Sequence, residues 1–273
     1  MPELPEVEMV RRVLTPHLKG KIIENVKIIN TQVIAAPSPE KFTSYVKGQT
    51  IVDFLRRGKF LRLALSGGDY LTLHMRMTGC LTIEPYGTPC EKHTHLIFEL
   101  NDGSELRYDD TRRLGKFWYT EQGARDESGA EKLGVEPLSG KLTAQYLRIR
   151  SETSKKTVKA MLLDQSIVAG IGNIYSDEIL FTAHIRPDKP CSALSDKEFE
   201  RLASVIPERL EYFIDKNAMS FREYSLGKGR DYRNTPYLQV YGKAGTHCPV
   251  CGDTLQRTVL SGRSSVFCFH CQN

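Results

Sequence analysis

The chain has 273 residues, of which 40% are hydrophobic, so it can bury a substantial core and has the length of about two domains. Its net charge of +5 favours an anionic partner only weakly, and its longest apolar runs fall well short of the roughly 18 residues of a membrane-spanning helix. Neither an export signal nor the cysteine spacing of a disulfide-stapled secreted domain is visible, so we expect a cytoplasmic protein.

Pro2 is the first candidate for chemistry, because removal of the initiator methionine would leave its ring nitrogen as a free secondary amine. An α-amino group has a pKa of about 7.7 to 8.0, so a sizeable fraction is unprotonated near neutral pH and can act as a nucleophile. Glu3 and Glu6 lie close enough in sequence to supply a proton donor and an orienting carboxylate. The same segment also has the features of a helix start, since Pro5 suits the first helical position. Both interpretations stay open at this point.

Strand-like segments follow the first helix, which Val7, Val10 and Leu14 continue at helical spacing as far as Pro16. Turn signals separate the strand-like segments, with hairpin turns expected at 67–68 and 102–103. The predicted strands are 22–29, 51–55, 60–65, 70–77, 96–100 and 105–108. In the run 70–77, the period of two places His74 and Arg76 together on the face opposite the apolar one. We therefore predict a two-layer β domain that carries a helix at its start, a sandwich or flattened barrel.

A polar, glycine-bearing stretch from 123 to 140 separates this β domain from a helical part. Helices are predicted over 154–165 and 174–181, and a third begins at a capping box formed by Ser195 and Glu198. The loop 170–175 lacks the third glycine and the preceding strand of a dinucleotide fingerprint, so we expect no nucleotide cofactor. With Asn173 as the N-cap of the next helix, its N–H groups could instead bind a phosphate; an ordinary tight turn is the alternative.

Four cysteines near the end of the chain have the spacing of a zinc site. They form two pairs, Cys248 with Cys251 and Cys268 with Cys271, joined by a predicted β hairpin. The spacing predicts one structural Zn²⁺, because four protein ligands leave no position for a water nucleophile. Disulfides or chance pairing are the alternatives, and His247 and His270 are expected to point away from the metal. Arg263 lies in the segment 262–265, at the expected hairpin tip. It could offer its charge to a ligand from a rigid scaffold, or it could be an ordinary solvated side chain.

Taken in order, these motifs resemble those of the bacterial formamidopyrimidine-DNA glycosylases. The matching segments are 2–6, 57–60, 74–77, 92–95, 110–115, 163–165, 170–175 with Glu178, 241–242 and the four-cysteine finger. The resemblance spans the whole chain, and so many motifs in the same order make coincidence implausible. It strongly favours a catalytic role for Pro2 over a role in the helix start alone.

The resemblance implies a bifunctional glycosylase and AP lyase of base-excision repair. Such enzymes remove oxidised purines, above all 8-oxoguanine and formamidopyrimidines, and then cut the strand by β and δ elimination. By similarity, Pro2 attacks C1′ of the damaged nucleoside and forms an iminium, Glu3 is the acid/base at the sugar, and Glu6 supports the site. Lys59 matches the lysine linked to β elimination, and Arg263 matches the finger arginine linked to δ elimination.

The same resemblance assigns the DNA contacts. The positions that match the DNA-contacting residues of the family are His74, His93, Lys155, Asn173 and Tyr241. The positions that match the three void-filling residues are Met77, Arg112 and Leu114. A base inside a duplex hides C1′, so the nucleotide must be extruded, and these three side chains would fill the gap. The expected partner is double-stranded DNA that contains an oxidised base, bound by a monomer without membrane contact.

Two departures from the family pattern leave the lesion preference open. Leu114 replaces the usual phenylalanine wedge, and 217–220 replaces a Gly-Gly-Ser/Thr-Ser/Thr run ahead of the lesion-capping loop, expected at 222–237. One alternative is an oxidised-pyrimidine glycosylase of endonuclease VIII type, although Leu4 in place of that branch's glycine favours the purine branch. The other is a non-catalytic damaged-DNA-binding protein, which a retained Met1 would favour.

The predicted fold class is α+β. It combines an N-terminal two-layer β-sandwich that has a leading helix with a C-terminal helical domain, which has a helix-two-turns-helix motif and a four-cysteine zinc-finger β hairpin. The predicted domains are a catalytic β-sandwich at 1–130, a linker at 131–140, a helix-two-turns-helix DNA-binding domain with the lesion-capping loop at 141–237, and the zinc finger at 238–273. We expect the protein in the cytoplasm, associated with the nucleoid.

Overall fold

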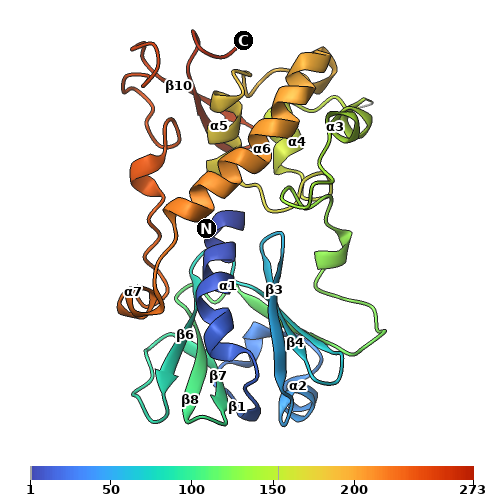
Figure 1. The fold of residues 1–273 in the computed structure, drawn as a ribbon, viewed down its shortest axis with the longest axis vertical. Coiled ribbons are helices and arrows are strands. Elements are labelled where there is room, and N and C mark those ends of the chain that lie inside the picture. Colours follow the sequence, from blue (N-terminus) through green and yellow to red (C-terminus); the bar gives the residue numbers. More distant parts are fainter. Residues whose placement is uncertain (1, 153) are drawn as a thin grey trace. The chain divides into compact units, whose positions relative to one another are not determined.

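The computed structural model describes residues 2–152 and 154–273, which form two compact units. Of these residues, the first unit holds Pro2, 6–131 and 218–232, and the second holds 3–5, 132–217 and 233–273. Figure 1 shows that the first is rich in strands and the second in helices. Residues 218–232, which lie within the predicted domain 141–237, pack with the β-rich unit instead.

Two sheets form the first unit. The four-stranded sheet has the order β1 (Ile23–Ile28), β7 (Thr94–Leu100), β8 (Ser104–Asp110) and β6 (Gly79–Pro85). The five-stranded sheet has the order β2 (Ile34–Ala36), β9 (Lys116–Thr120), β5 (Tyr70–His74), β4 (Phe60–Leu65) and β3 (Ile51–Arg57). All neighbouring strands pair antiparallel except β2 with β9. The predicted two-layer β architecture is therefore confirmed, although β2, β6, β9 and the helix α2 (Pro39–Val46) were not predicted.

One hydrophobic core joins both sheets to the helix α1 (Leu4–Leu18). Val10 and Leu14 of α1 are fully buried. Phe98 of β7 is also fully buried, and Phe117 of β9 is 2% exposed. Each such side chain contributes roughly 1.5 to 3 kcal/mol by leaving water. The helix begins one residue before the expected start at Pro5 and continues past Pro16, where the fully buried Leu18 packs its last turn into the core.

Strand β5 ends at His74, so the predicted shared face of His74 and Arg76 is wrong. Arg76 has a φ of 59°, and this left-handed backbone turns the chain out of the sheet and leaves the arginine exposed. Its N–H donates to Nδ1 of His74 at 3.0 Å. The His74 ring stays buried, edge-on to Phe60 with 4.7 Å between ring centroids.

The second unit contains the helices α3 (Ala144–Ser151), α4 (Val158–Leu163), α5 (Asn173–Thr182) and α6 (Asp196–Lys216), whereas α7 (Phe221–Leu226) belongs to the first. The predicted capping box of α6 is confirmed, since Glu198 accepts from the N–H and hydroxyl of Ser195 at 2.8 and 2.9 Å. The predicted helix 154–165 is shorter, because Thr157 caps it by accepting from the N–H of Ala160 at 3.3 Å. Lys155 therefore precedes α4.

A two-stranded hairpin, β10 (Gln256–Leu260) and β11 (Arg263–Phe267), forms the finger. Ser261 and Gly262 both have positive φ, as a tight hairpin turn requires, so they form the tip, and residues 263–265 of the predicted tip belong to β11. Arg263 is exposed and opens β11, opposite Leu260. Short 3₁₀ helices lie at Thr31–Val33, Ala130–Lys132, Cys191–Ala193 and Thr235–Tyr237. None of the helices within the described residues is long and apolar enough to cross a membrane.

Candidate functional site

Pro2 lies in the wall of a pocket of about 190 Å³ in the first unit. The other lining residues come from three distant segments of the chain: Met77, Thr78, Gly79, Thr111, Arg230 and Tyr232. The pocket therefore brings the candidate nucleophile together with one expected void-filling residue and with two side chains of the expected capping loop. Sequence reasoning located that loop but singled out neither Arg230 nor Tyr232.

Glu6 is buried on α1, with 2% of its surface exposed. Burial raises the pKa of Tyr232 above its usual range, and the negative charge of Glu6 raises it further. The Tyr232 hydroxyl therefore stays protonated at physiological pH and remains a hydrogen-bond donor in the pocket wall.

The carboxylate of Glu3 occupies the N-terminus of α5 in the second unit. Its oxygens accept from the N–H groups of Gly172 at 2.7 Å, Ile174 at 3.0 Å and Tyr175 at 3.4 Å. A helix N-terminus attracts negative charge, and here the chain supplies its own. In this structure these three N–H groups therefore bind the chain's own carboxylate. The expected N-cap is wrong, because Gly172 caps the helix and Asn173 is its first residue.

The loop before α5 is shaped for close approach of the N-terminal segment. The N–H of Leu4 donates to the carbonyl of Gly170 at 3.0 Å, and a Cβ on Gly170 would lie 2.6 Å from the Leu4 side chain. Gln165 closes the loop, accepting from the N–H of Gly170 at 2.9 Å and donating to the carbonyl of Ile171 at 2.7 Å. These contacts fix the backbone that holds Glu3.

Lys59 lies in the turn between β3 and β4 and is 8% exposed. Arg56 donates from Nη1 to the carbonyl of Gly58 at 3.1 Å and from Nε to Glu8 of α1 at 3.0 Å. The turn that carries Lys59 is thus tied to α1 through Glu8. Sequence reasoning did not assign these ion pairs to Glu8, although its spacing from Arg11 and Arg12 is that of helical ion pairs.

Glu8 should stabilise the fold in a pH-dependent way. Burial raises its pKa, but hydrogen bonds and charges, first those of Arg11 and Arg12, outweigh burial and lower the pKa from 4.5 to about 2. A lowered folded-state pKa gives stability that is complete above pH 4.5 and is lost as pH falls toward 2. Glu8→Gln should therefore cost on the order of 2 kcal/mol in urea unfolding at pH 7, and clearly less at pH 3. An equal cost at both pH values would contradict this role.

Asp110 organises the turn that carries two of the void-filling candidates. Its carboxylate accepts from the N–H groups of Arg112 at 3.1 Å, Leu114 at 2.8 Å and Gly115 at 2.9 Å. Burial raises its pKa, but hydrogen bonds, first from the Thr78 hydroxyl and Gly115, keep the pKa below its usual value. The carboxylate therefore stays ionised and the turn stays fixed.

The void-filling candidates themselves are exposed. Met77 is 44% exposed and Leu114 is 42% exposed, although both are apolar. Nη1 of Arg112 donates to Sδ of Met77 at 2.8 Å, so the structure brings these two together. Exposed apolar side chains beside an arginine suit insertion into a base stack.

The two candidate DNA-contacting histidines lie in the same unit. Burial lowers the pKa of His74 to about 3, with help from the charges of Arg76 and Lys59. His74 is therefore neutral at physiological pH, and since Nδ1 accepts from Arg76, its proton lies on Nε2. Within residues 2–152 and 154–273, Nδ1 of His93 is buried without a hydrogen-bond partner, while the His93 carbonyl accepts from the N–H of Asp110 at 3.0 Å.

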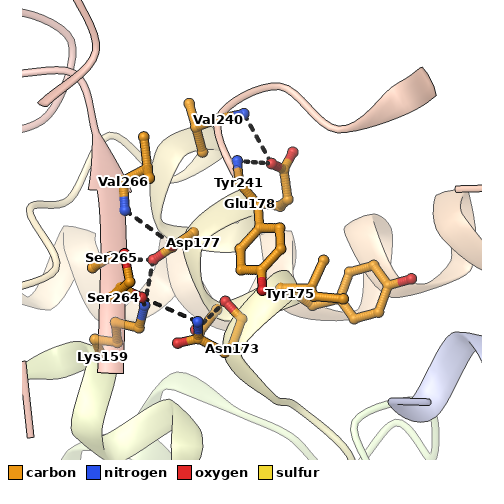
Figure 2. A network of polar contacts seen from close by, with 12 residues as sticks. Lys159, Asn173, Tyr175, Asp177, Glu178, Val240, Tyr241, Ser264, Ser265 and Val266 are labelled. Atoms are coloured by element: carbon orange, nitrogen blue, oxygen red, sulfur yellow. Dashed lines mark hydrogen bonds and ion pairs between the residues drawn. The ribbon is translucent and has the colours of Figure 1, made fainter. Parts of the chain in front are cut away.

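A buried ion pair in the second unit joins α4 and α5 to the finger (Figure 2). Nζ of Lys159 donates to Oδ1 of Asp177 at 2.7 Å, and both side chains are at most 1% exposed. Asp177 also accepts from the Ser265 hydroxyl at 2.6 Å and from the N–H of Val266 at 3.0 Å. Two residues of β11 are therefore held by one carboxylate of α5.

The remaining contacts of this network position two predicted DNA contacts. Nδ2 of Asn173 donates to the carbonyl of Ser264 at 3.0 Å, next to Arg263 (Figure 2). Glu178 is fully buried and accepts from the N–H of Tyr241 at 2.9 Å. Lys155 is exposed ahead of α4, and no contact in this network includes it. Sequence reasoning missed Lys159 and Asp177, which the structure places at the centre.

The four finger cysteines are arranged for zinc. Their sulfur atoms lie within 4.8 Å of one another, with 3.8 Å between those of Cys248 and Cys271 and 3.4 Å between those of Cys251 and Cys268. A tetrahedral ion with bonds of about 2.3 Å sets sulfur atoms about 3.8 Å apart, so the set fits Zn²⁺. His247 contacts the Gly252 carbonyl and His270 lies near Asp253, so neither is a ligand. The predicted zinc site is confirmed.

Removing this ion should unfold the finger, since four close thiolates without a cation repel one another. A strong chelator at neutral pH should release about one Zn²⁺ per chain and make residues 247–273 sensitive to protease, while the β-rich first unit keeps its resistance. Metal analysis and mass spectrometry of the fragments measure both effects. A finger that stays resistant after complete zinc loss would show that the ion does not hold it.

Three family models together match most of the chain. The formamidopyrimidine-DNA glycosylase N-terminal domain matches residues 1–117, the formamidopyrimidine-DNA glycosylase H2TH domain matches 133–225, and the zinc finger found in FPG and IleRS matches 247–273. The chain belongs to the formamidopyrimidine-DNA glycosylase family. The predicted family and fold class are thereby confirmed, and so is the predicted activity of a DNA glycosylase that is also an AP lyase.

Full-length relatives agree with this assignment. The formamidopyrimidine-DNA glycosylase of Carboxydothermus hydrogenoformans is 42% identical over 272 residues, which cover 100% of both chains. That of Geobacillus kaustophilus is 42% identical over 274 residues, again with both chains covered completely. Among solved structures, Lactococcus lactis Fpg in complex with a FAPY-dG-containing DNA has a TM-score of 0.88 and 31% identity, covering 99% of this chain and 100% of that one.

Proposed function

We propose that this chain excises oxidised purines, chiefly 8-oxoguanine and formamidopyrimidines, from double-stranded DNA and cuts the strand at the resulting abasic site. The observation that carries the proposal is the position of Pro2, in the wall of a pocket that also contains Met77, Arg230 and Tyr232. A base extruded from the duplex into this pocket would lie beside the amine that attacks its sugar. Structures of the related Lactococcus lactis Fpg contain FAPY-dG DNA and abasic-site DNA, which supports this substrate class.

The reaction needs a free amine, a group that handles protons and a means of breaking the strand. With Met1 removed, the Pro2 nitrogen forms a bond to C1′ while the bond from C1′ to the base breaks, and the base leaves with a proton. Opening of the sugar ring then gives an iminium. Glu3 is the acid/base at the sugar, and its three N–H donors fix its oxygens in place. Glu6 supports the site.

The iminium acidifies the neighbouring C2′ protons, so the 3′ phosphate leaves by β elimination and the 5′ phosphate follows by δ elimination. Lys59 assists the first step from the β3–β4 turn, and Arg263 grips phosphate for the second from the start of β11. A lysine or arginine beside a phosphate stabilises the charge that develops as the phosphate leaves.

The DNA is held mainly through its phosphates, which a repair enzyme can bind in any sequence. His74 donates as a neutral N–H, and His93, Lys155, Asn173 and Tyr241 supply further contacts. Met77 and Leu114 wedge the stack where the base has left, and Arg112 hydrogen-bonds the orphaned partner base. The protein acts as a monomer in the cytoplasm, at the nucleoid. Its proposed domains are 1–130, 131–140, 141–237 and 238–273, with residues 218–232 of the third packed in the β-rich unit.

A panel of duplexes that differ in one base tests the proposal. We expect purified protein to incise duplexes carrying 8-oxoguanine, formamidopyrimidine or an abasic site, and to leave phosphate at both ends of the gap. Undamaged duplex should stay intact. Glu3→Gln should lose base release on the same panel, because an amide cannot shuttle the proton.

Two other outcomes would replace the proposal. Incision confined to oxidised pyrimidines would identify an endonuclease VIII-like specificity. A structure of the related Lactococcus lactis Fpg contains oxidised-pyrimidine DNA, so this outcome has a precedent in binding. Tight binding to damaged duplex without any incision, by a protein whose intact mass includes Met1, would identify a non-catalytic damage-binding protein.

A further inference from the structure

Met77 is, among the described methionines, the one that the fold leaves open to solvent. It is 44% exposed at the turn between β5 and β6, where the N–H of Gly79 donates to the carbonyl of Met75 at 3.1 Å. Met219 is partly buried against the core of the first unit. Three other methionines are at most 2% exposed: Met9, Met75 and Met161. A dissolved oxidant therefore meets the sulfur of Met77 first.

The thiol nearest to Met77 along the chain is protected from the same oxidant. Cys80 is 1% exposed, and burial raises the pKa of its thiol to about 11. The thiol is therefore protonated at physiological pH, and a buried thiol without thiolate character oxidises slowly. Cys90, in the loop after β6, and Cys251, in the finger, are exposed. Any test of Met77 must therefore separate its oxidation from theirs.

The sulfur of Met77 already has a cationic donor beside it. Nη1 of Arg112 donates to Sδ, and Arg112 is itself exposed. The Arg112 backbone is fixed, because its N–H donates to the Thr78 hydroxyl at 3.2 Å and to Asp110 at 3.1 Å. A thioether is a weak acceptor, so this side-chain hydrogen bond is easily exchanged for one with a base. An oxygen on the same sulfur is a stronger acceptor, and its hydrogen bond with a guanidinium is charge-assisted.

Oxidation by hydrogen peroxide changes this side chain in one step. A lone pair of Sδ attacks one oxygen of the peroxide, and the O–O bond breaks. The proton on the transferred oxygen moves to the other oxygen, which leaves as water. The sulfur gives up two electrons and the peroxide is reduced. The apolar thioether thus becomes a polar sulfoxide, which methionine sulfoxide reductases convert back.

We propose that Met77 is a reversible oxidation site whose sulfoxide weakens the binding of damaged DNA. Inside the base stack, the sulfoxide oxygen has two states. It either keeps the Arg112 donor, which the orphaned base then lacks, or it is buried without a partner. Both states are unfavourable compared with the apolar thioether. The inference rests on the proposed function, in which Met77 wedges the stack and Arg112 hydrogen-bonds the orphaned base.

Mass spectrometry after brief treatment with hydrogen peroxide tests the site. Trypsin cuts after Arg76, so Met77 and its buried neighbour Met75 fall in different peptides, 77–92 and 63–76. We expect the sulfoxide at Met77 while Met75 stays reduced. A bound duplex that carries an abasic-site analogue should protect Met77, because the proposed complex buries this side chain. Equal oxidation of the two methionines in the free protein would overturn the inference.

The affinity for the same duplex, measured before and after oxidation, tests the consequence for binding. Wild-type affinity should fall at least roughly tenfold, and methionine sulfoxide reductase should restore it. Met77→Leu keeps an apolar side chain without a sulfur, so its affinity should not change on oxidation. Met75→Leu is the matched control, since it replaces a buried methionine by a side chain of similar volume and should stay as sensitive as wild type. Met77→Gln, which carries a polar acceptor, should bind weakly without any oxidant.

The exposed thiols and the finger are the same in all of these proteins. A loss of affinity that is equally large in Met77→Leu and wild type therefore comes from cysteine oxidation and overturns the inference. Complete oxidation of Met77 with an affinity within twofold of the untreated protein also overturns it. Unoxidised wild-type protein that neither binds the analogue nor cleaves an abasic duplex overturns the proposed function and the effect on binding with it. The mass spectra still show in that case which methionine reacts.

Discussion

A variant with one extra residue before Pro2 should lose the covalent adduct that borohydride traps on an 8-oxoguanine duplex. The added residue turns the Pro2 ring nitrogen into an amide, which has no nucleophilic lone pair. Loss of an essential nucleophile removes the chemical step, so we expect the rate of base release to fall at least about a thousandfold. Denaturing gels after borohydride treatment measure the adduct, and intact mass establishes the chain terminus in each sample.

DNA binding provides the control for this experiment. His74, Arg112 and the finger do not depend on the terminal amine, so the variant should bind an abasic-site analogue within a few-fold of the wild-type affinity. If the variant still forms the adduct at the wild-type rate, another amine is the nucleophile. Lys59 is the first residue to test in that case, because it is a primary amine in the same unit.

The sequence carried enough information for the zinc site because all four ligands lie within one hairpin, where spacing along the chain sets spacing in space. The same holds for the α6 capping box, whose partners are three residues apart. The sequence did not carry enough information to predict the hydrogen bonds of Glu3. That carboxylate meets N–H groups about 170 residues further along the chain, and no local pattern records such a contact.

Helix α4 shows a second reason why a buried contact could not be predicted from the sequence. Lysines at 155, 156 and 159 look alike in composition, and position along a helix decides which one is buried. Thr157 starts the helix and places Lys159 on the face of Val158 and Leu162, which pack into the core of the second unit. A lysine among apolar helical positions was the available signal, but its partner Asp177 lies on another helix. The ion pair therefore became visible only in the folded chain.

Asp177→Ala should destabilise the second unit strongly. It would leave the ammonium of Lys159 buried without its carboxylate, and breaking a buried ion pair in this way costs about 3 to 5 kcal/mol. Because Asp177 also accepts from Ser265 and Val266 of β11, the finger should loosen, and the δ-elimination product should fall more than base release. Urea unfolding measures the first effect, and the ratio of β to δ products measures the second.

Asp188→Ala is the matched control, because its ion pair with Arg186 lies in the same unit but its side chain is 40% exposed. An exposed pair contributes at most about 1 kcal/mol, so this variant should stay close to wild type. The double variant Lys159→Met with Asp177→Leu removes the unpaired charge and should recover part of the loss. It cannot recover all of it, since the N–H of Val266 stays buried without an acceptor, at about 1 to 3 kcal/mol. If the double variant recovers all of the lost stability, the ion pair only neutralises its own two charges, and other contacts hold β11.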